Sequence, residues 1–249
     1  MKLHLGLLGA VALLPLCGAA AETKHHWSYS GETGPSHWSA LEPDYATCAK
    51  GDTQSPIDIQ TAHVRQQALP PLQFNYKSSA LHIVNNGHTI QVEVPADSHL
   101  MIGGDNYTLV QFHFHHPSEE TIDGKHYAMV VHLVHRDAKG HLAVVAVPLR
   151  SGAANPLIAT LWHNLPKTGG RESSPHVAID AAGLLPQNHA YYAYSGSLTT
   201  PPCSQGVHWY VLKTPVTVSA DQIATFAHLY PSNARSAQPL HGRVVLSSK

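Results

Sequence analysis

Apolar and polar positions alternate with a period of two along much of this 249-residue chain. Successive side chains of a β-strand point to opposite faces of the sheet, so this alternation indicates strands rather than helices. The pattern is rich in Val, Ile, Phe and Tyr and is bounded by turn residues. It predicts strands at residues 81–85, 89–94, 109–115, 128–135, 142–149 and 207–212.

Helical periodicity is scarce, and its best examples are residues 156–163 and 220–229. Asn86-Gly87 predicts a tight hairpin turn between two of the strands. No repeat, low-complexity segment or change of composition marks a linker. We therefore predict a mostly β (α+β) single domain, in which short helices lie at the periphery of a sheet.

The N-terminus has the pattern of a secretory signal peptide. Lys2 precedes a mostly apolar stretch at 5–16, and Ala19-Ala20-Ala21 supplies small residues for cleavage. The stretch is too short to span a bilayer as a helix. Cys17 raises the alternative of a lipoprotein, but the large Leu16 precedes it, where a lipidated cysteine normally follows a small residue. We predict a signal peptide at 1–21 and a domain at 22–249 that is not associated with a membrane once the signal peptide is removed. The mature protein is predicted to be periplasmic or secreted.

Two cysteines, Cys48 and Cys203, remain after cleavage. In an exported chain they predict one disulfide, with two separate buried thiols as the alternative. The bridge would close a loop of about 155 residues. In the chain-entropy model such a loop stabilises the fold by about 4–5 kcal/mol.

Composition narrows the chemistry. The chain has 15 Lys+Arg against 16 Asp+Glu, only 12% charged residues, and 21 His. A near-neutral, charge-poor chain excludes a disordered charged tail and argues against a nucleic-acid partner. Histidine is the commonest metal ligand and titrates near neutrality, so its excess indicates metal or proton-transfer chemistry, unless most rings simply lie at the surface.

The strand at 109–115 contains Gln111-Phe112-His113-Phe114-His115. Its period of two places His113 and His115 on one face and the phenyl rings on the other. In the strand at 128–135, His132 and His135 point to opposite faces, so one of them can join the pair. Three nitrogen ligands with an open fourth position are typical of a catalytic zinc site.

Ordered motifs along nearly the whole mature chain, from about 26 to 245, resemble the alpha-class carbonic anhydrases, especially exported bacterial members. The motifs are Trp27-x-Tyr29, Gly34-Pro35-x-His37-Trp38, Gln54-Ser55-Pro56-Ile57-Asp58-Ile59, Asn85-Asn86-Gly87-His88, Gln111 to His115, His132-Leu133-Val134-His135, Ser197-Leu198-Thr199-Thr200-Pro201-Pro202 and Gln238-Pro239-Leu240. The resemblance implies one domain around a twisted, largely antiparallel sheet of about ten strands, with a conical cavity that ends at Zn²⁺. It also implies reversible hydration of CO₂ to bicarbonate and a proton, with a secondary esterase activity.

The resemblance assigns roles by position. It implies that His113, His115 and His132 bind zinc, which lowers the pKa of its bound water to about 7 so that hydroxide attacks CO₂. Thr199 would accept a hydrogen bond from that hydroxide and donate one to Glu119. His88 would carry the released proton to solvent.

The same resemblance implies a substrate pocket and a partner. Thr200 would contact bicarbonate, and dimers among bacterial relatives allow a homodimer by analogy. An apolar wall would receive CO₂, although from sequence alone its members are ordinary core residues. The wall would consist of Val134, Val144, Leu198, Val207 and Trp209.

Two positions depart from the family pattern. Val130 stands two residues before the third ligand, where the family has a glutamate that accepts the spare N–H of that ring. Losing such a partner commonly costs about 10- to 100-fold in metal affinity or activity. Glu120 stands where a histidine is usual. We therefore expect an active enzyme with weakened or labile zinc, which Val130→Glu would tighten; the alternative is a non-catalytic zinc- or ligand-binding member of the same fold.

Overall fold

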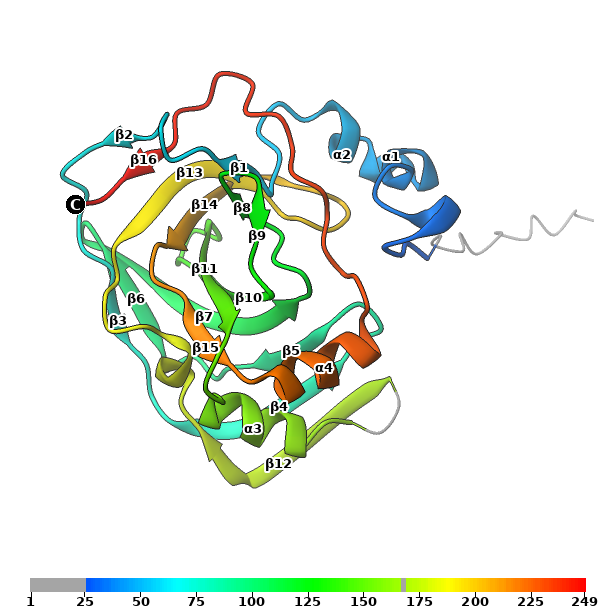
Figure 1. Cartoon of the computed structure of the whole chain (residues 1–249), viewed down its shortest axis with the longest axis vertical. Coiled ribbons are helices and arrows are strands. Elements are labelled where there is room, and N and C mark those ends of the chain that lie inside the picture. Colours follow the sequence, from blue (N-terminus) through cyan, green and yellow to red (C-terminus); the bar gives the residue numbers. More distant parts are fainter. Residues whose placement is uncertain (1–25, 167–168) are drawn as a thin grey trace, which may run out of the picture.

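A computed structural model describes residues 26–166 and 169–249. The predicted signal peptide at 1–21, with Cys17, lies outside the described residues. A large curved sheet runs through the molecule, and the helices are short and lie around it (Figure 1). The prediction of a mostly β domain with peripheral helices is confirmed.

The main sheet contains 13 strands, ten of which follow one path in the order β12-β4-β5-β7-β10-β11-β14-β13-β16-β2, and β1, β8 and β9 form a separate sheet of three strands. Most neighbours are antiparallel, whereas β11–β14, β11–β15 and β16–β2 are parallel. The strands are β1 (Asp58–Ile59), β2 (Arg65–Gln66), β3 (Gln73–Asn75), β4 (Ser79–Asn85), β5 (Ile90–Glu93), β6 (His99–Ile102), β7 (Asp105–His115), β8 (Thr121–Ile122), β9 (Lys125–His126), β10 (Met129–Arg136), β11 (Leu142–Ser151), β12 (Gly170–Ile179), β13 (Tyr191–Ser197), β14 (Gln205–Leu212), β15 (Val216–Val218) and β16 (Leu246–Ser247). The helices are η1 (Gly31–Thr33), α1 (Trp38–Leu41), η2 (Pro43–Tyr45), α2 (Thr47–Lys50), α3 (Pro156–His163), η3 (Ala181–Leu184) and α4 (Ala220–Leu229).

Every strand predicted from alternation is present, as β4, β5, β7, β10, β11 and β14, and both predicted helices are present as α3 and α4. The Asn86-Gly87 turn joins antiparallel β4 and β5, and Gly87 has the positive φ of +85° that such a turn favours. Among strands of seven or more residues, the prediction missed β12 and β13; it also missed the shorter β1, β2, β3, β6, β8, β9, β15 and β16. β12 is a polar edge strand interrupted by a register shift, and β13 contains Gly196. A Cβ at Gly196 would lie 2.8 Å from Trp209 Cδ1, so close packing requires the glycine there.

The strands β10 and β11 are buried on both faces, and their alternate residues enter two separate hydrophobic clusters. On β10, Val131 and Leu133 belong to the larger cluster, whereas Val130 belongs to the smaller one. Phe112 and Phe114 of β7 lie with the larger cluster, as the period of two requires. We call the side facing this cluster the phenyl face and the opposite side the histidine face, because His113, His115 and His132 lie there.

Helices α3 and α4 close the phenyl face. Asn155 caps α3 by accepting the Ile158 N–H, and a capping box between Ser219 and Gln222 starts α4. The Trp162 ring on α3 stacks on Phe226 of α4, with 5.8 Å between centroids, and both rings contact Phe114. The helices therefore bury one side of β7 and leave the other side for the histidines.

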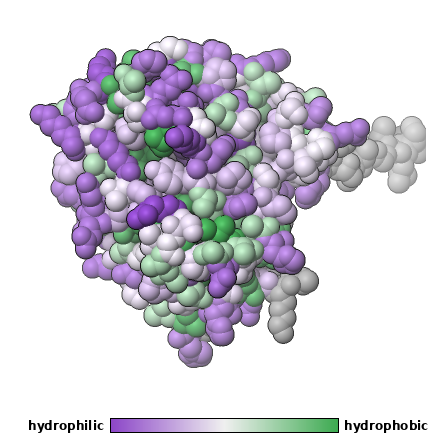
Figure 2. Space-filling view, viewed as in Figure 1, coloured by the Kyte–Doolittle hydropathy of each residue, from purple (hydrophilic) through white to green (hydrophobic). Residues whose placement is uncertain are grey.

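A disulfide joins Cys48 on α2 to Cys203 before β14, across 155 residues. The predicted bridge is therefore confirmed, and it indicates an oxidising, extracytoplasmic location. No helix of the described residues is long and apolar enough to cross a membrane. The face shown in Figure 2 intersperses hydrophilic and hydrophobic residues, and its most hydrophobic residues form small separate patches.

Candidate metal centre

The strand register brings three histidine rings together. β7 and β10 are antiparallel, with His132 opposite His113 and Val130 opposite His115. Since paired residues share a face, His132 joins the other two rings, and the ring centroids lie 4.7–5.4 Å apart. One nitrogen from each ring lies within 4.8 Å of the others, and no other such group of metal-ligating side chains occurs in 26–166 and 169–249. His135 points to the opposite face, where its Nε2 lies 2.7 Å from the Tyr76 hydroxyl.

Two of the rings are held by carbonyl oxygens. His113 Nδ1 lies 2.8 Å from Gln111 Oε1, and His115 Nδ1 lies 2.7 Å from the backbone oxygen of Asn233. Because a carbonyl can only accept, Nδ1 donates in both rings and Nε2 keeps its lone pair. The Nε2 atom of His115 is buried without a hydrogen-bond partner among the described residues.

His132 is held in the reverse sense. Its Nε2 lies 3.3 Å from Glu120 Oε2, which leaves Nδ1 for the centre of the cluster. The expectation that this ring lacks a carboxylate partner is therefore wrong. Val130 is indeed apolar and buried, but the neighbouring loop supplies Glu120 instead.

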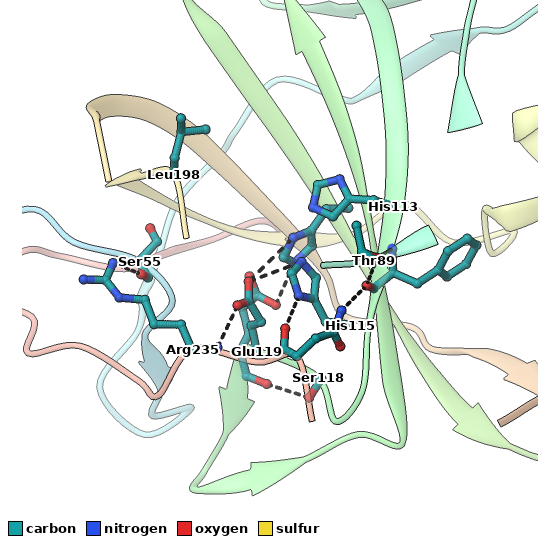
Figure 3. Close-up of polar contacts among 12 residues, drawn as sticks. Ser55, Thr89, His113, His115, Ser118, Glu119, Leu198 and Arg235 are labelled. Carbon is teal, nitrogen blue, oxygen red and sulfur yellow. Dashed lines mark hydrogen bonds and ion pairs between the residues drawn. The ribbon is translucent and has the colours of Figure 1, made fainter. Parts of the chain in front are cut away.

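Glu119 lies beside the free nitrogens. Its Oε1 accepts the Arg235 backbone N–H at 2.8 Å, and its Oε2 lies 3.5 Å from His115 Nε2 (Figure 3). Burial raises the pKa of the Glu119 carboxyl to about 7, while the His132 ring and hydrogen bonds from Arg235 and the Thr199 hydroxyl act in the opposite direction. Thr199 therefore lies near the carboxylate with which the family resemblance pairs it, while Glu119 Oε2 has no hydrogen-bond partner among the described residues.

Burial also sets the protonation of the histidines. It lowers the pKa of His113 to about 3 and lowers the pKa of His115 well below its usual value, with neighbouring rings adding to the effect. Burial alone would lower the pKa of His132 as well, but the Glu120 and Glu119 carboxylates raise it. Neutral imidazole is the form that binds metal.

These residues fit Zn²⁺. Each of the three rings has one nitrogen tied to an outer acceptor and the other directed to a common centre, and one of those central nitrogens is an orphaned buried atom. Three histidine ligands with a remaining open position define the donor set of a catalytic zinc site. Outer acceptors on every ring are the usual means of fixing the ligand orientation.

An apolar surface adjoins the rings on the histidine face. The Trp209 ring packs edge-on to His132, with 4.9 Å between centroids, and its Nε1 donates to the Ser197 backbone oxygen. Of the residues predicted to receive CO₂, three belong to the smaller hydrophobic cluster, namely Val144, Val207 and Trp209. The other two, Val134 and Leu198, are partly buried and pack against that cluster.

The segment carrying Thr199 and Thr200 lies between β13 and β14 and is fixed at both ends. Leu198 N–H donates to the Ser204 oxygen, and Cys203 N–H donates to the Thr200 oxygen, at 2.9 and 2.8 Å. The disulfide then anchors Cys203 to the N-terminal helices. Thr199 is buried and Thr200 is half-buried.

His88 lies at the β4–β5 turn and is half-buried. Its ring stacks on Trp27, with 3.6 Å between centroids, and His26 lies 5.2 Å away. Burial, and secondarily His26, lowers the pKa of His88. The Asn233 side chain donates to the His88 backbone oxygen, while the Asn233 backbone oxygen holds His115, so one residue links the turn to the cluster.

Sequence reasoning missed Asn233 and Arg235. Arg235 is 2% exposed, and its guanidinium donates to Gln54 Oε1 and to the Ser55 and Cys48 backbone oxygens. These contacts join segments more than 100 residues apart, so no local sequence pattern predicts them. Only the block Gln54 to Ile59 contained a signal, because it marked the other side of this network without an assigned role.

Fold and site together define a metalloenzyme in which a three-histidine zinc site lies on one face of a large twisted sheet. A family model described as eukaryotic-type carbonic anhydrase matches residues 33–249. A carbonic anhydrase of Klebsiella pneumoniae is 45% identical over 252 residues, covering 99% of this chain and 100% of that protein. One from Nostoc is 44% identical over 90% of this chain and 86% of its own length. The alpha-carbonic anhydrase of Thermovibrio ammonificans, solved with the inhibitor sulfanilamide, has a TM-score of 0.86 at 44% identity, covering 90% of this chain and 99% of that one.

The chain belongs to the alpha carbonic anhydrase family, which consists of zinc-dependent lyases that hydrate carbon dioxide. Its three converging histidines provide the metal site that this activity requires.

Proposed function

We propose that this carbonic anhydrase hydrates CO₂ reversibly to bicarbonate and a proton, with His113, His115 and His132 as its zinc ligands. The observation that carries the proposal is the set of three ring nitrogens left facing one centre, each in a ring whose other nitrogen is tied. When bound, zinc in such a site makes a nucleophile available at neutral pH by lowering the pKa of water to about 7.

Thr199 and Glu119 orient the attack. Glu119 is fixed by the Arg235 N–H, and its other oxygen, which has no hydrogen-bond partner among the described residues, is the one we assign to accept from the nearby Thr199 hydroxyl. A hydroxyl that donates its proton to a carboxylate offers only lone pairs on its other side. The Thr199 oxygen therefore accepts a hydrogen bond from the attacking oxygen and leaves a lone pair of that oxygen directed at the carbon of CO₂.

We assign CO₂ and bicarbonate to different residues of the site. CO₂ carries no charge or net dipole, so the apolar surface made by Val144, Val207 and Trp209 suits it. The new bicarbonate has an anionic carboxylate and a hydroxyl, and the half-buried Thr200, next to Thr199 in the chain, is the residue we assign to contact it. Val134 and Leu198 are half-buried and complete the wall.

His88 carries the proton away. Hydration of each CO₂ releases one proton, which must leave the site before the next turnover. The His88 ring is half-buried at a turn, and the pKa lowering leaves it neutral at pH 7, so that it can accept the proton at a ring nitrogen. Release to solvent then restores the neutral ring.

The extracytoplasmic location is proposed more specifically as periplasmic or secreted, after removal of residues 1–21. N-terminal sequencing of the exported protein tests this, since it should begin at residue 22. A homodimer is a further prediction, made by analogy with bacterial relatives, and light scattering of the purified protein should give twice the chain mass.

Stopped-flow CO₂ hydration with the zinc-loaded protein tests the function. We expect a rate well above buffer that a sulfonamide abolishes, since the relative from Thermovibrio ammonificans was solved with sulfanilamide as its inhibitor. Thr199→Ala should lower the rate by about 10²-fold, the range for losing one oriented hydrogen bond at a reacting oxygen. A zinc-loaded protein with no rate above buffer would contradict the proposal and favour the non-catalytic alternative.

A further inference from the structure

The outer partners of the three histidines differ in kind. His113 and His115 donate to neutral carbonyl oxygens through Nδ1, whereas the Nε2 atom of His132 faces the carboxylate of Glu120. Glu120 is thus the one charged outer partner of the cluster among the described residues. It also holds the one ring that faces the centre through Nδ1.

His132 cannot obtain this contact from its own strand. Val130 shares the histidine face of β10, is 1% exposed, and packs in the smaller hydrophobic cluster with Tyr194. An isopropyl group neither accepts nor donates a hydrogen bond. The position two residues before the ligand, which lies next to it on the same face, is therefore closed to polar contact.

Glu120 reaches the ring from a loop that is itself fixed. Ser118 Oγ donates to the Glu120 backbone oxygen at 2.8 Å and accepts the Tyr127 N–H at 2.9 Å. Immediately after Glu120, β8 pairs with β1, and Thr121 Oγ1 donates to Asp58. The carboxylate therefore enters the core from a backbone held on both sides.

The Glu120 side chain has one evident task. It is 3% exposed, its Oε2 faces His132, and its Oε1 has no hydrogen-bond partner among the described residues. Burying a carboxylate is costly unless the group is hydrogen-bonded. Glu119, its neighbour, accepts the Arg235 backbone N–H and has its other oxygen 3.5 Å from His115 Nε2, so the two buried carboxylates face different groups.

We propose that Glu120 is a positioning residue of the metal centre, whose carboxylate accepts the Nε2–H of His132 and so keeps Nδ1 directed at the metal in place of the carboxylate that Val130 lacks. This inference rests on the zinc site proposed above. It reverses the expectation of labile zinc, and it means that Val130→Glu in the natural chain adds a second carboxylate to a ring that already has one. That substitution should not tighten zinc.

The test is the zinc dissociation constant, measured by competition with a chelator of known affinity. We expect Glu120→Ala to weaken zinc by about 10- to 100-fold, the usual cost of removing an outer partner. Glu120→Gln, which keeps an accepting oxygen without the charge, should fall between Glu120→Ala and the natural chain. Thr121→Val is the matched control, because it removes the neighbouring hydrogen bond to Asp58 without touching His132, and it should leave zinc affinity unchanged.

Rescue separates positioning from general destabilisation. Glu120→Ala combined with Val130→Glu returns a carboxylate to His132 from its own strand and should restore most of the lost affinity. The absorption spectrum of the Co²⁺-substituted protein should change in Glu120→Ala and return in the double variant. Because Glu120→Gln preserves volume, its zinc affinity decides the question if the alanine variant does not fold.

Natural zinc affinity in folded Glu120→Ala and Glu120→Gln would overturn the inference. Equal weakening by Thr121→Val, or no rescue by Val130→Glu, would also overturn it. Failure of the proposed function looks different, because the natural protein would then bind no zinc at the histidines or would hydrate no CO₂ with zinc bound.

Discussion

The two faces of β7 and β10 are made by alternate residues of the same strands, yet they are held in different ways. On the phenyl face, Phe112, Phe114 and Leu133 are fully buried among apolar side chains contributed in part by α3 and α4. On the histidine face, each ring nitrogen that does not face the centre meets a specific acceptor, and two of these acceptors, Asn233 and Glu120, come from outside β7 and β10. One face depends on volume, and the other depends on hydrogen-bond partners placed by the whole fold.

The largest difference should appear between two histidines of β10. His132→Ala removes a ligand and should abolish both zinc binding and CO₂ hydration. His135→Ala, three residues along on the phenyl side, removes the contact with Tyr76 and should lower stability while zinc binding and hydration remain. Metal analysis and stopped-flow assays of both variants check this, and loss of zinc from both would show that the two faces are not independent.

Replacing both Cys48 and Cys203 by serine should lower the free energy of unfolding by about 4–5 kcal/mol, as expected for freeing a loop of this length. The bridge anchors the segment that follows Thr199 and Thr200, so hydration should also fall. Denaturant unfolding of the natural and variant proteins measures the first effect. Unchanged stability would mean that other long-range contacts suffice to hold the histidine face.

Phe114→Ala, unlike the cysteine variant, should lower stability without lowering the hydration rate. Deleting a buried phenyl ring typically costs about 3–5 kcal/mol. The ring contacts Trp162 and Phe226 and points away from the metal centre, so zinc affinity and the hydration rate of the folded protein should be preserved. A large loss of zinc affinity in the folded variant would show that packing on one face positions the ligands on the other.

His88→Ala tests proton transfer between the metal centre and solvent. In dilute buffer kcat should fall by about 10²-fold, at the lower end for loss of a proton-transferring side chain, and added imidazole should restore it. His63→Ala, which removes an exposed histidine bonded to Gln60, is the control and should change nothing.

The pH dependence sharpens this assignment. His88 accepts a proton only when neutral, so kcat should rise with pH as the ring deprotonates. Because burial and His26 lower the pKa of His88, the plateau should be reached at lower pH than for an ordinary histidine. His26→Ala removes part of that lowering and should move the rise to higher pH, whereas an unchanged profile would separate His26 from the shuttle.

The sequence predicted the fold best where one face of a strand differs chemically from the other. β7 and β10 carry that difference residue by residue, and the two longer helices show clear periodicity. β12 and β13 were missed because polar residues, a proline and Gly196 interrupt their alternation, and pairing with β4 and β14 decides their conformation. The overall sheet architecture came from the family resemblance rather than from periodicity.

The site residues likewise differ in how far local sequence patterns predict them. The histidine pair and a third strand histidine are visible in local spacing, because ligands on neighbouring strands need only the correct face. Asn233, Arg235 and Glu120 are not visible in that way, because their partners lie in other parts of the chain. Glu120 was noticed only as a departure from the family pattern, and its relation to Val130 required the spatial position of the loop before β8.

Zinc held on the histidine face is, in this interpretation, what hydrates CO₂. The direct measurement is the stopped-flow hydration rate of the chelator-stripped protein as zinc is added back in measured amounts. We predict no rate above buffer without metal, a linear rise with bound zinc, and saturation at one zinc per chain. A rate that survives metal removal, or no activity at one bound zinc per chain, would contradict this interpretation.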